Sequence, residues 1–415
     1  MSGHVLLVPK TENPPAKVKD RGVINLVKAG GAAYNAKNGE VLLLPNGEAK
    51  RRALASELKS ALFERCGIQS VDCGSDAAIL SIAERFAREY GSLAAAFCEE
   101  RGRTIRIVSW SGDADAARSM AAETMAAVAG VIEGPGLNPE GVGFSFAQER
   151  TPAGGVSFSL LSRCDAGAIG ARQGVFCASC GAMLLPDSPY GFAHTPPDEP
   201  MEELEDIESP GANTVAELCR QTGIDETRAI KAMLYAAPDE SGAARAVAAF
   251  VRGDHSVSMN KLSAWVRAAL CLGEPHTATA REVEQLIGEV AGYCGPIGMP
   301  DSVSTVADER VRGLRNMVVG ANRQGYHRKG CCHPRDFDPT FADIVALAGG
   351  MPCQCGGAFE ASPLRESGSL FLGTAGETAG GDLKALTWRD RDGPHGCPAI
   401  CHASLSIESL LLATA

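Results

Sequence analysis

The middle of the chain carries, in order, a cation, a glycine-rich loop, a carboxylate, a second glycine-rich loop and an imidazole. Lys231 opens an apolar run, where its ammonium can emerge at the end of a strand. Two glycines in the loop 292–296 free the backbone to direct amides inward, and its proline fixes the turn. Asp308 follows a strand-like stretch, and His327 ends the loop 320–327. Groups of this kind can hold an anion and stabilise charge on a reacting oxygen.

Each of these residues also has a simpler explanation when it is taken alone. A single lysine is usually solvated, and a single aspartate or histidine usually caps or packs. Glycine-rich loops are mostly turns. Their order and spacing together favour a site, whose candidate catalytic residues are Lys231, Gly292, Gly295, Pro296, Asp308 and His327.

The same region concentrates basic side chains in a chain whose formal net charge is −11. That charge argues against nucleic acid covering the whole surface, but phosphate contacts depend on where Lys and Arg cluster. We expect one face that holds nucleic-acid phosphates; the alternative is a solvated basic face. The cluster consists of Arg310, Arg312, Arg315, Arg323, Arg328, Lys329 and Arg335.

Local patterns predict the elements that must position these residues. Thr214 with Glu217, and Thr279 with Glu282, have the spacing of capping boxes and should begin helices, the second ending near Gly288 and Gly292. Two apolar runs, 232–235 and 246–251, flank a turn-rich segment and predict a β-hairpin. A strand at 317–319 leads into the second glycine loop. The middle segment is therefore expected to be a compact α/β unit.

The flanking segments differ in composition. Residues 1–185 alternate strand-like runs, such as 41–44 and 105–108, with helical stretches at 49–66 and 77–95, which indicates an α+β domain. Residues 186–208 are rich in Pro, Asp and Glu and are predicted to be a linker. The predicted domains are 1–185, then 209–350 after the linker, and 351–415 as a continuation of the first domain.

The order of motifs in 209–350 resembles the editing domain inserted in bacterial prolyl-tRNA synthetases, which also stands alone in YbaK-like deacylases. The matching text is Ser209-Pro210-Gly211, Ile230-Lys231, Val251 to His255, Gly292 to Pro296, Val306-Ala307-Asp308, and Val318 to His327. The resemblance implies a pocket for the aminoacylated end of a transfer RNA. Lys231 would be its anchoring lysine, the loop 292–296 its amide-lined loop, and Asp308 and His327 pocket residues. Gly320, Asn322 and Arg323, with the other basic residues, would bind the substrate or the tRNA.

The flanks resemble a class II synthetase sheet interrupted by this editing unit. Matching stretches are 26–31, 44–47, 165–170, 372–374 and 396–398. Class II activation needs two arginines on the phosphates of ATP. Cys98 and Ser404 stand where those arginines belong, so we expect a degenerate synthetase domain that does not activate an amino acid with ATP.

The chain has 15 cysteines, and without an export signal we expect reduced thiols or metal ligands instead of disulfides. The pairs Cys177-x-x-Cys180 and Cys353-x-Cys355 could together hold a structural zinc ion. The second pair has the less favourable bite, and free core thiols are the alternative. No other cofactor is expected.

Neither a membrane span nor a secretory signal is predicted, so the expected location is the cytoplasm. A homodimer is possible.

These observations favour aminoacyl transfer from tRNA without ATP. The acceptor would be a small amine-like molecule, because a deacylase needs only the middle domain whereas a large flanking domain persists here. Trans-editing hydrolysis of mischarged tRNA, such as alanyl-tRNA(Pro), is the alternative. A non-catalytic synthetase paralogue is a third reading.

Overall fold

The computed structural model describes residues 5–7, 32–35, 40–43, 53–58, 60–61, 93–100, 104–111, 114–132, 143–150, 156–168, 170–190, 196–288, 292–374 and 399–413. The chain divides into two compact units, residues 1–185 with 348–415, and residues 186–347. Of the stretches that resemble a synthetase, 26–31, 44–47 and 396–398 lie outside the described residues. Among the described helices, none is long and apolar enough to cross a membrane.

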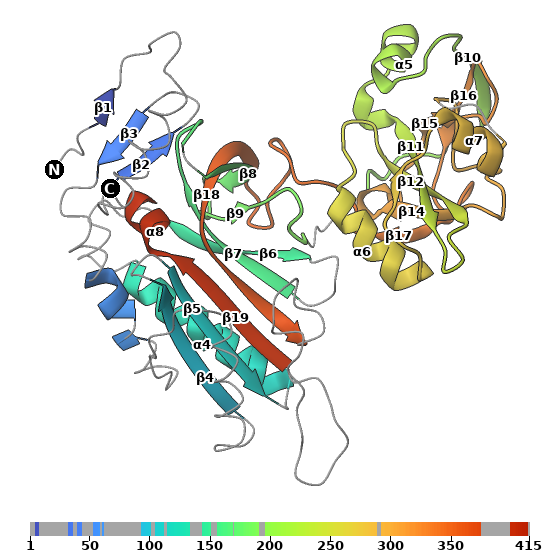
Figure 1. Ribbon diagram of the computed structural model, residues 1–415. Coiled ribbons are helices and arrows are strands. Elements are labelled where there is room, and N and C mark those ends of the chain that lie inside the picture. Colours follow the sequence, from blue (N-terminus) through green and yellow to red (C-terminus); the bar gives the residue numbers. More distant parts are fainter. Residues whose placement is uncertain are drawn as a thin grey trace, which may run out of the picture. The chain divides into compact units, whose positions relative to one another are not determined.

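The first unit is built on an eight-stranded sheet whose main path runs β4-β5-β19-β18-β7-β6, with β8 paired to β18 and β9 to β8 (Figure 1). Every pairing in it is antiparallel. The strands are β4 (Leu93–Glu100), β5 (Thr104–Ser111), β6 (Phe144–Arg150), β7 (Val156–Arg163), β8 (Ala171–Cys177), β9 (Met183–Leu184), β18 (Phe359–Thr374) and β19 (Ala399–Ser406). A separate sheet joins β1 (Val5–Leu7), β3 (Glu40–Leu43) and β2 (Ala32–Asn35).

Among the described elements, α4 (Ala114–Ile132) and α8 (Ile407–Ala413) both contact the large sheet. Small apolar residues of α4, such as Ala121, Ala127 and Val128, are buried in one core with Leu160 and Leu370 of the strands. Small side chains let the helix approach the sheet closely, so the alanine-rich composition of this region produces a tight layer.

The second unit combines two sheets, a five-stranded one of order β13-β11-β12-β14-β17 and a three-stranded one of order β10-β16-β15. The strands are β10 (Glu205–Glu208), β11 (Ile230–Pro238), β12 (Ala244–Arg252), β13 (His276–Thr277), β14 (Ser304–Asp308), β15 (Met317–Gly320), β16 (Tyr326–Cys331) and β17 (Thr340–Ala342). The helices are α5 (Val215–Thr222), α6 (Met259–Leu270) and α7 (Ala280–Ile287), with 3-10 turns η1 (Glu226–Arg228) and η2 (Glu309–Val311). β12, β14 and β17 run parallel, so this unit is mixed α/β as predicted.

The predicted local elements of the second unit are confirmed. The side chains of Thr214 and Thr279 each accept a hydrogen bond from the backbone amide of the glutamate three residues on. The carboxylate of that glutamate in turn accepts from the backbone amide of the threonine, so both capping boxes form. α7 ends with Gly288 in the left-handed conformation. The hairpin pairs β11 with β12 from Ile230↔Arg252 to Pro238↔Ala244.

Two local predictions were wrong. The helix expected at 77–95 cannot run to its predicted end, because residues 93–95 already belong to β4; residues 77–92 lie outside the described part. The acidic segment is not a free linker from end to end. Its last part forms β10, which pairs with β16 from Glu205↔Lys329 to Glu208↔Tyr326, because oppositely charged side chains face each other across the two strands.

Candidate functional site

A cavity of about 320 Å³ lies between the start of α5, the first residues of β11 and the two glycine-rich loops. This volume is within the usual range for small-molecule sites. It places three predicted catalytic residues together, Lys231, Gly292 and His327, and also the predicted binding residue Gly320. The remaining lining residues are Asn213, Thr214, Val215, Leu218, Ala229, Ile230, Ala232, Met233 and Cys294.

Lys231 brings the positive charge to this cavity. It is the second residue of β11, and its ammonium donates to the carbonyl oxygen of Gly253 at 2.9 Å. An ammonium has three donors, so this bond fixes the side chain and leaves donors for a ligand. Burial lowers the pKa of Lys231, and the nearby Asp254 and Glu226 oppose that shift.

His327 supplies the imidazole. Its side chain is buried, and Nδ1 lies 2.7 Å from the hydroxyl oxygen of Ser209. Burial lowers the pKa of His327, so the ring is neutral at neutral pH. Since Ser209 holds Nδ1, the tautomer set by this hydrogen bond decides whether Nε2 donates to a ligand or accepts from it.

The two glycine-rich loops pack backbone against backbone beside the cavity. A Cβ added to Gly295 would lie 1.9 Å from the carbonyl oxygen of Gly320, and one added to Gly320 would lie 2.2 Å from that of Cys294. Neither position can hold a larger residue without moving the other loop. Asn322 joins the loops, because its Oδ1 accepts from the Gly295 amide at 2.7 Å and its Nδ2 donates to the carbonyl of Ile297 at 2.9 Å.

This packing corrects three predictions about the loops. The amide of Gly295 donates to Asn322 and is not directed at a substrate. Neither Gly295 nor Pro296 lines the cavity, and Asn322, which also lies outside its lining, uses both side-chain polar groups to connect the loops. The first loop contributes Gly292 and Cys294 to the wall.

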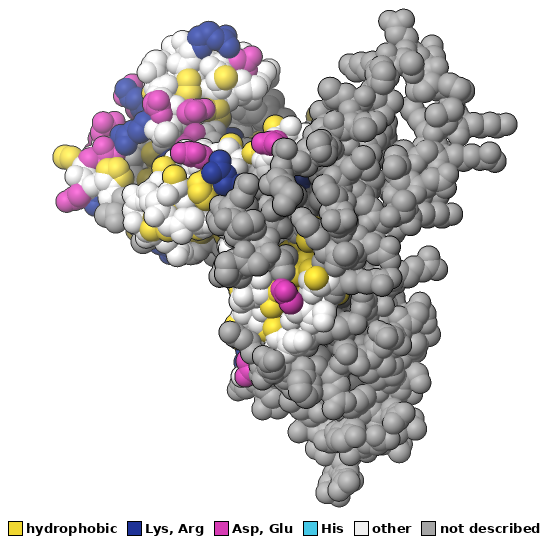
Figure 2. Space-filling view, turned by 90° about the vertical axis from the view of Figure 1, so that its left-hand side faces the viewer, with side chains coloured by type: hydrophobic (Ala, Val, Ile, Leu, Met, Phe, Trp, Pro, Cys, Tyr) yellow, Lys and Arg dark blue, Asp and Glu magenta, His cyan; other side chains and the backbone are white. Residues whose placement is uncertain are grey.

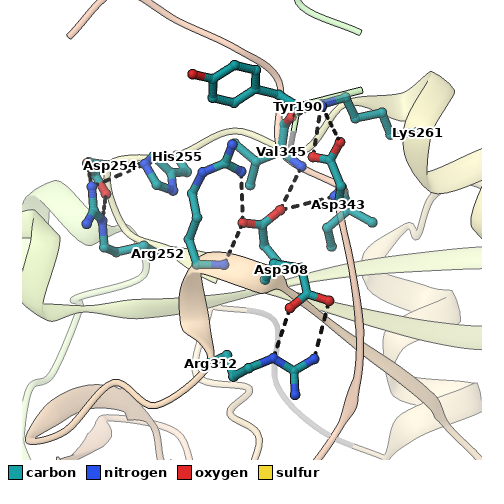
Figure 3. A network of polar contacts seen from close by, with 12 residues as sticks. Tyr190, Arg252, Asp254, His255, Lys261, Asp308, Arg312, Asp343 and Val345 are labelled. Atoms are coloured by element: carbon teal, nitrogen blue, oxygen red, sulfur yellow. Dashed lines mark hydrogen bonds and ion pairs between the residues drawn. The ribbon is translucent and has the colours of Figure 1, made fainter. Parts of the chain in front are cut away.

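The prediction that Asp308 is a pocket residue was also wrong. Its side chain is fully buried: Oδ1 accepts from the backbone amide and guanidinium of Arg310, and Oδ2 accepts from the amides of Ile344 and Val345 (Figure 3). A buried carboxylate needs such partners. Nearby, the buried Lys261 donates to Asp343 at 3.0 Å and to the carbonyl of Val345 at 2.9 Å. Asp308 therefore holds the segment after β17 in place.

The predicted basic face is largely neutralised by acidic side chains of the same unit. Arg315 pairs with Asp198, Arg323 and Arg328 pair with Asp206, and Lys329 pairs with Glu205. Arg310 is buried against Asp308, and Arg312 pairs with Glu309 and lies over the ring of Phe341. Arg335 pairs with Asp336. On the described surface in Figure 2, basic and acidic side chains are intermingled instead of forming one basic patch.

Sequence reasoning missed part of the cavity wall. Asn213 and Thr214 line it, although Thr214 was noticed only as a helix cap. Ser209 was noticed as matching text, but its contact with His327 joins residues 118 positions apart, which no local pattern signals. The aliphatic residues of the wall lie in segments whose sequences look like those of any buried strand or helix. Cys294 is buried in this wall.

The remaining predicted residues belong to the other unit. The sulfurs of Cys177, Cys180, Cys353 and Cys355 all lie within 4.8 Å of one another. Cys98 on β4 and Ser404 on β19 both have Arg106 of β5 as their Cα partner, so the two positions share one row across the sheet. This register is compatible with the expectation that the positions of Cys98 and Ser404 belong to one ATP site in a class II synthetase. The class II assignment of this unit stays a prediction.

The α/β unit, its capped α5 and the cavity between the glycine loops define the class of domain. Residues 209–330 match the family model of the aminoacyl-tRNA editing domain. The chain therefore carries an editing domain of this family within a longer, two-unit chain.

Several proline-tRNA ligases are among the curated proteins that resemble this chain. The chain is 32% identical over 253 residues to the enzyme of Persephonella marina, a match that covers 56% of this chain and 42% of the relative. It is 36% identical over 174 residues to that of Kosmotoga olearia, covering 41% of this chain and 28% of the relative. For Salinispora tropica the identity is 34% over 219 residues, covering 51% and 36%. The chain is thus similar to proline-tRNA ligases, and the match spans less than half the length of these relatives.

A crystal structure described as that of a candidate trans-editing enzyme for prolyl tRNA synthetase is also similar. It shares 20% identity at a TM-score of 0.29, with 34% of this chain and 86% of that chain covered. The assignment of residues 209–330 to the editing-domain family rests on the sequence matches and not on this structural similarity.

Proposed function

We propose that the cavity beside Lys231 and His327 binds the aminoacylated 3′ end of a transfer RNA and cleaves the aminoacyl ester. The observation that carries this proposal is the convergence of one cation, one neutral imidazole and two glycine loops on a single cavity in a domain that matches the editing family. The family match supports hydrolysis. It does not specifically support the transfer to an amine that the sequence alone led us to expect.

The lining suits an ester with a small or aliphatic side chain. Val215, Leu218 and Met233 offer an apolar surface, and Ala229 and Ala232 leave room beside them. Burial of each methylene of a substrate contributes about 0.8 kcal/mol. The cavity would therefore hold an aliphatic aminoacyl group well, while a charged side chain would meet an apolar wall without a partner.

Ester cleavage needs no nucleophile from the protein. The oxygen of water adds to the ester carbonyl carbon, the bond from that carbon to the ribose oxygen breaks, and the ribose oxygen takes up a proton from the attacking water. The products are a free amino acid and a free ribose hydroxyl. Lys231 would hold a terminal phosphate or ribose oxygen, and His327 would hydrogen-bond the bound end of the tRNA. Positioning and charge stabilisation of this kind are sufficient for a reactive ester.

A second candidate is transfer of the aminoacyl group to a small amine. The observation that favours it is the flanking unit, which forms an eight-stranded sheet of its own beyond what an editing domain requires. The amine nitrogen would then replace water at the same carbonyl carbon. Both candidates share the cleavage of the aminoacyl ester, and they differ in whether water or an amine attacks its carbonyl carbon.

Replacement of Lys231 by alanine tests the shared step. Loss of the ammonium that lines the cavity should lower kcat/KM for deacylation of alanyl-tRNA by about a hundredfold. The matched control is Arg245→Ala, since Arg245 is an exposed cation of the same hairpin and does not line the cavity. Equal activity of wild type and Lys231→Ala would remove the cavity from the reaction.

A further inference from the structure

The four cysteines of the first unit lie on two turns that the fold brings together. Cys177 ends β8 and is the Cα partner of Phe359 in β18, so the turn after Cys177 lies beside the turn before β18. In sequence, Cys180 precedes the second unit, which begins at Pro186, and Cys353 follows its end at Leu347. The cluster thus joins the strand that leads out to the editing unit and the strand that returns from it.

The spacing of the sulfurs fits a tetrahedral metal ion. Cys177 Sγ lies 3.5 Å from Cys355 Sγ, and Cys180 Sγ lies 3.7 Å from Cys353 Sγ, with all four within 4.8 Å of one another. Zinc–sulfur bonds of about 2.3 Å in a tetrahedron place the sulfurs about 3.8 Å apart. A disulfide requires about 2.05 Å, and all four cysteines are free.

Backbone amides are directed at the sulfurs, as thiolate ligands require. The amides of Ser179 and Cys180 donate to the sulfur of Cys177, and that of Ala182 donates to Cys180. The amide of Gly357 donates to Cys355. Ligands of a bound metal are usually held by hydrogen bonds from groups around them, and both turns provide such bonds.

The two turns also touch. A Cβ added to Gly357 would lie 2.5 Å from Ser179 Oγ and 3.2 Å from Cys177 Sγ, so a larger residue there would separate the pairs. The short C-x-C bite, which looked unfavourable in sequence, is compatible with the site, because the first sulfur of each pair lies close to the second sulfur of the other.

We propose that Cys177, Cys180, Cys353 and Cys355 bind one zinc ion through four thiolates. The ion ties β8 to the start of β18 at the point where the chain leaves and re-enters the first unit. Its role is structural, since four protein ligands leave no open position for a substrate.

The test is zinc content of the full chain, purified from zinc-supplemented medium and measured by mass spectrometry. One zinc per chain is expected for wild type and for Cys271→Ser, an exposed cysteine of the second unit. The double variant Cys180→Ser/Cys355→Ser should lose the metal. Iron, or no metal, in the wild-type chain would overturn the proposal, as would full zinc content in the double variant.

A second measurement needs no variant, in case the double variant fails to fold. A thiol-reactive mercurial added to the wild-type chain should release one zinc per chain to a colorimetric chelator as thiols are modified. Replacement by cobalt(II) should give the absorption of a tetrahedral tetrathiolate. Release without thiol modification, or a cobalt spectrum of oxygen or nitrogen ligands, would contradict the ligand set.

Discussion

At the scale of residues, the cavity depends on an imidazole that stays neutral. Burial lowers the pKa of His327 below its ordinary value of 6.5, and the contact with Ser209 holds Nδ1. A protonated ring in the same place would carry a charge that the buried site does not solvate. The neutral ring is therefore the form that we expect to bind substrate.

The pH dependence of deacylation follows from this shift. Activity should be constant through neutral pH and fall only in acid, as His327 takes up a proton at a pH below 6.5. Profiles of kcat/KM against pH for wild type and His327→Gln give the measurement, and the glutamine variant should lack that acid limb. An acid limb at or above pH 6.5, or one that the variant retains, would show that another group is responsible.

At the scale of elements, the cavity depends on the close approach of two loops. Gly295→Ala would place a methyl group 1.9 Å from the carbonyl oxygen of Gly320, so one loop must move. We expect a loss of about 1–3 kcal/mol in unfolding free energy, as for overpacked sites, and a large loss of deacylation. Thermal unfolding and kcat/KM give the comparison.

The control for this change is Gly143→Ala, where an added methyl group meets nothing within 4 Å. Unchanged activity and stability in Gly295→Ala would mean that the loops do not need this contact.

The acidic segment gives a second prediction at this scale. Asp206 lies opposite Arg328 in the β10–β16 pair and holds both Arg323 and Arg328. Asp206→Asn should free these two cations for phosphates, so tRNA should bind several-fold more tightly, with a steeper dependence on salt. Filter binding over a range of salt concentrations measures both effects.

Glu240→Gln removes one negative charge from an exposed hairpin turn and provides the control for net charge. If both variants bind tRNA like wild type, the two arginines do not contact it.

Much of the element structure could be predicted from local pattern. The capping boxes at Thr214 and Thr279 and the hairpin around 238–242 were correct, because short-range hydrogen bonds and turn chemistry determine them. Asp308, Asn322 and the basic residues were misplaced, because their partners are set by tertiary packing. Whether Asp308 faces a cavity or the amides of 344–345 is decided by β17, which lies more than thirty residues later.

At the scale of the whole molecule, the chain combines an editing unit with a flanking unit that lies outside the family match. The chain spans 42% of its relative from Persephonella marina, so the activity of a complete proline-tRNA ligase does not transfer to it. Cys98 and Ser404 share a row of the large sheet, where the resemblance to synthetases would place two arginines. The editing cavity is accordingly the part of the chain to which we assign chemistry.

Incubation of the full chain with labelled alanyl-, prolyl- or isoleucyl-tRNA, without ATP, tests the central claim most directly. We expect the label to leave the tRNA and, in buffer alone, to be recovered as free amino acid. Appearance of label on an added amine pool would identify the second candidate function. If all three esters remain intact both in buffer and with the amine pool, the claim that this cavity cleaves aminoacyl-tRNA is contradicted.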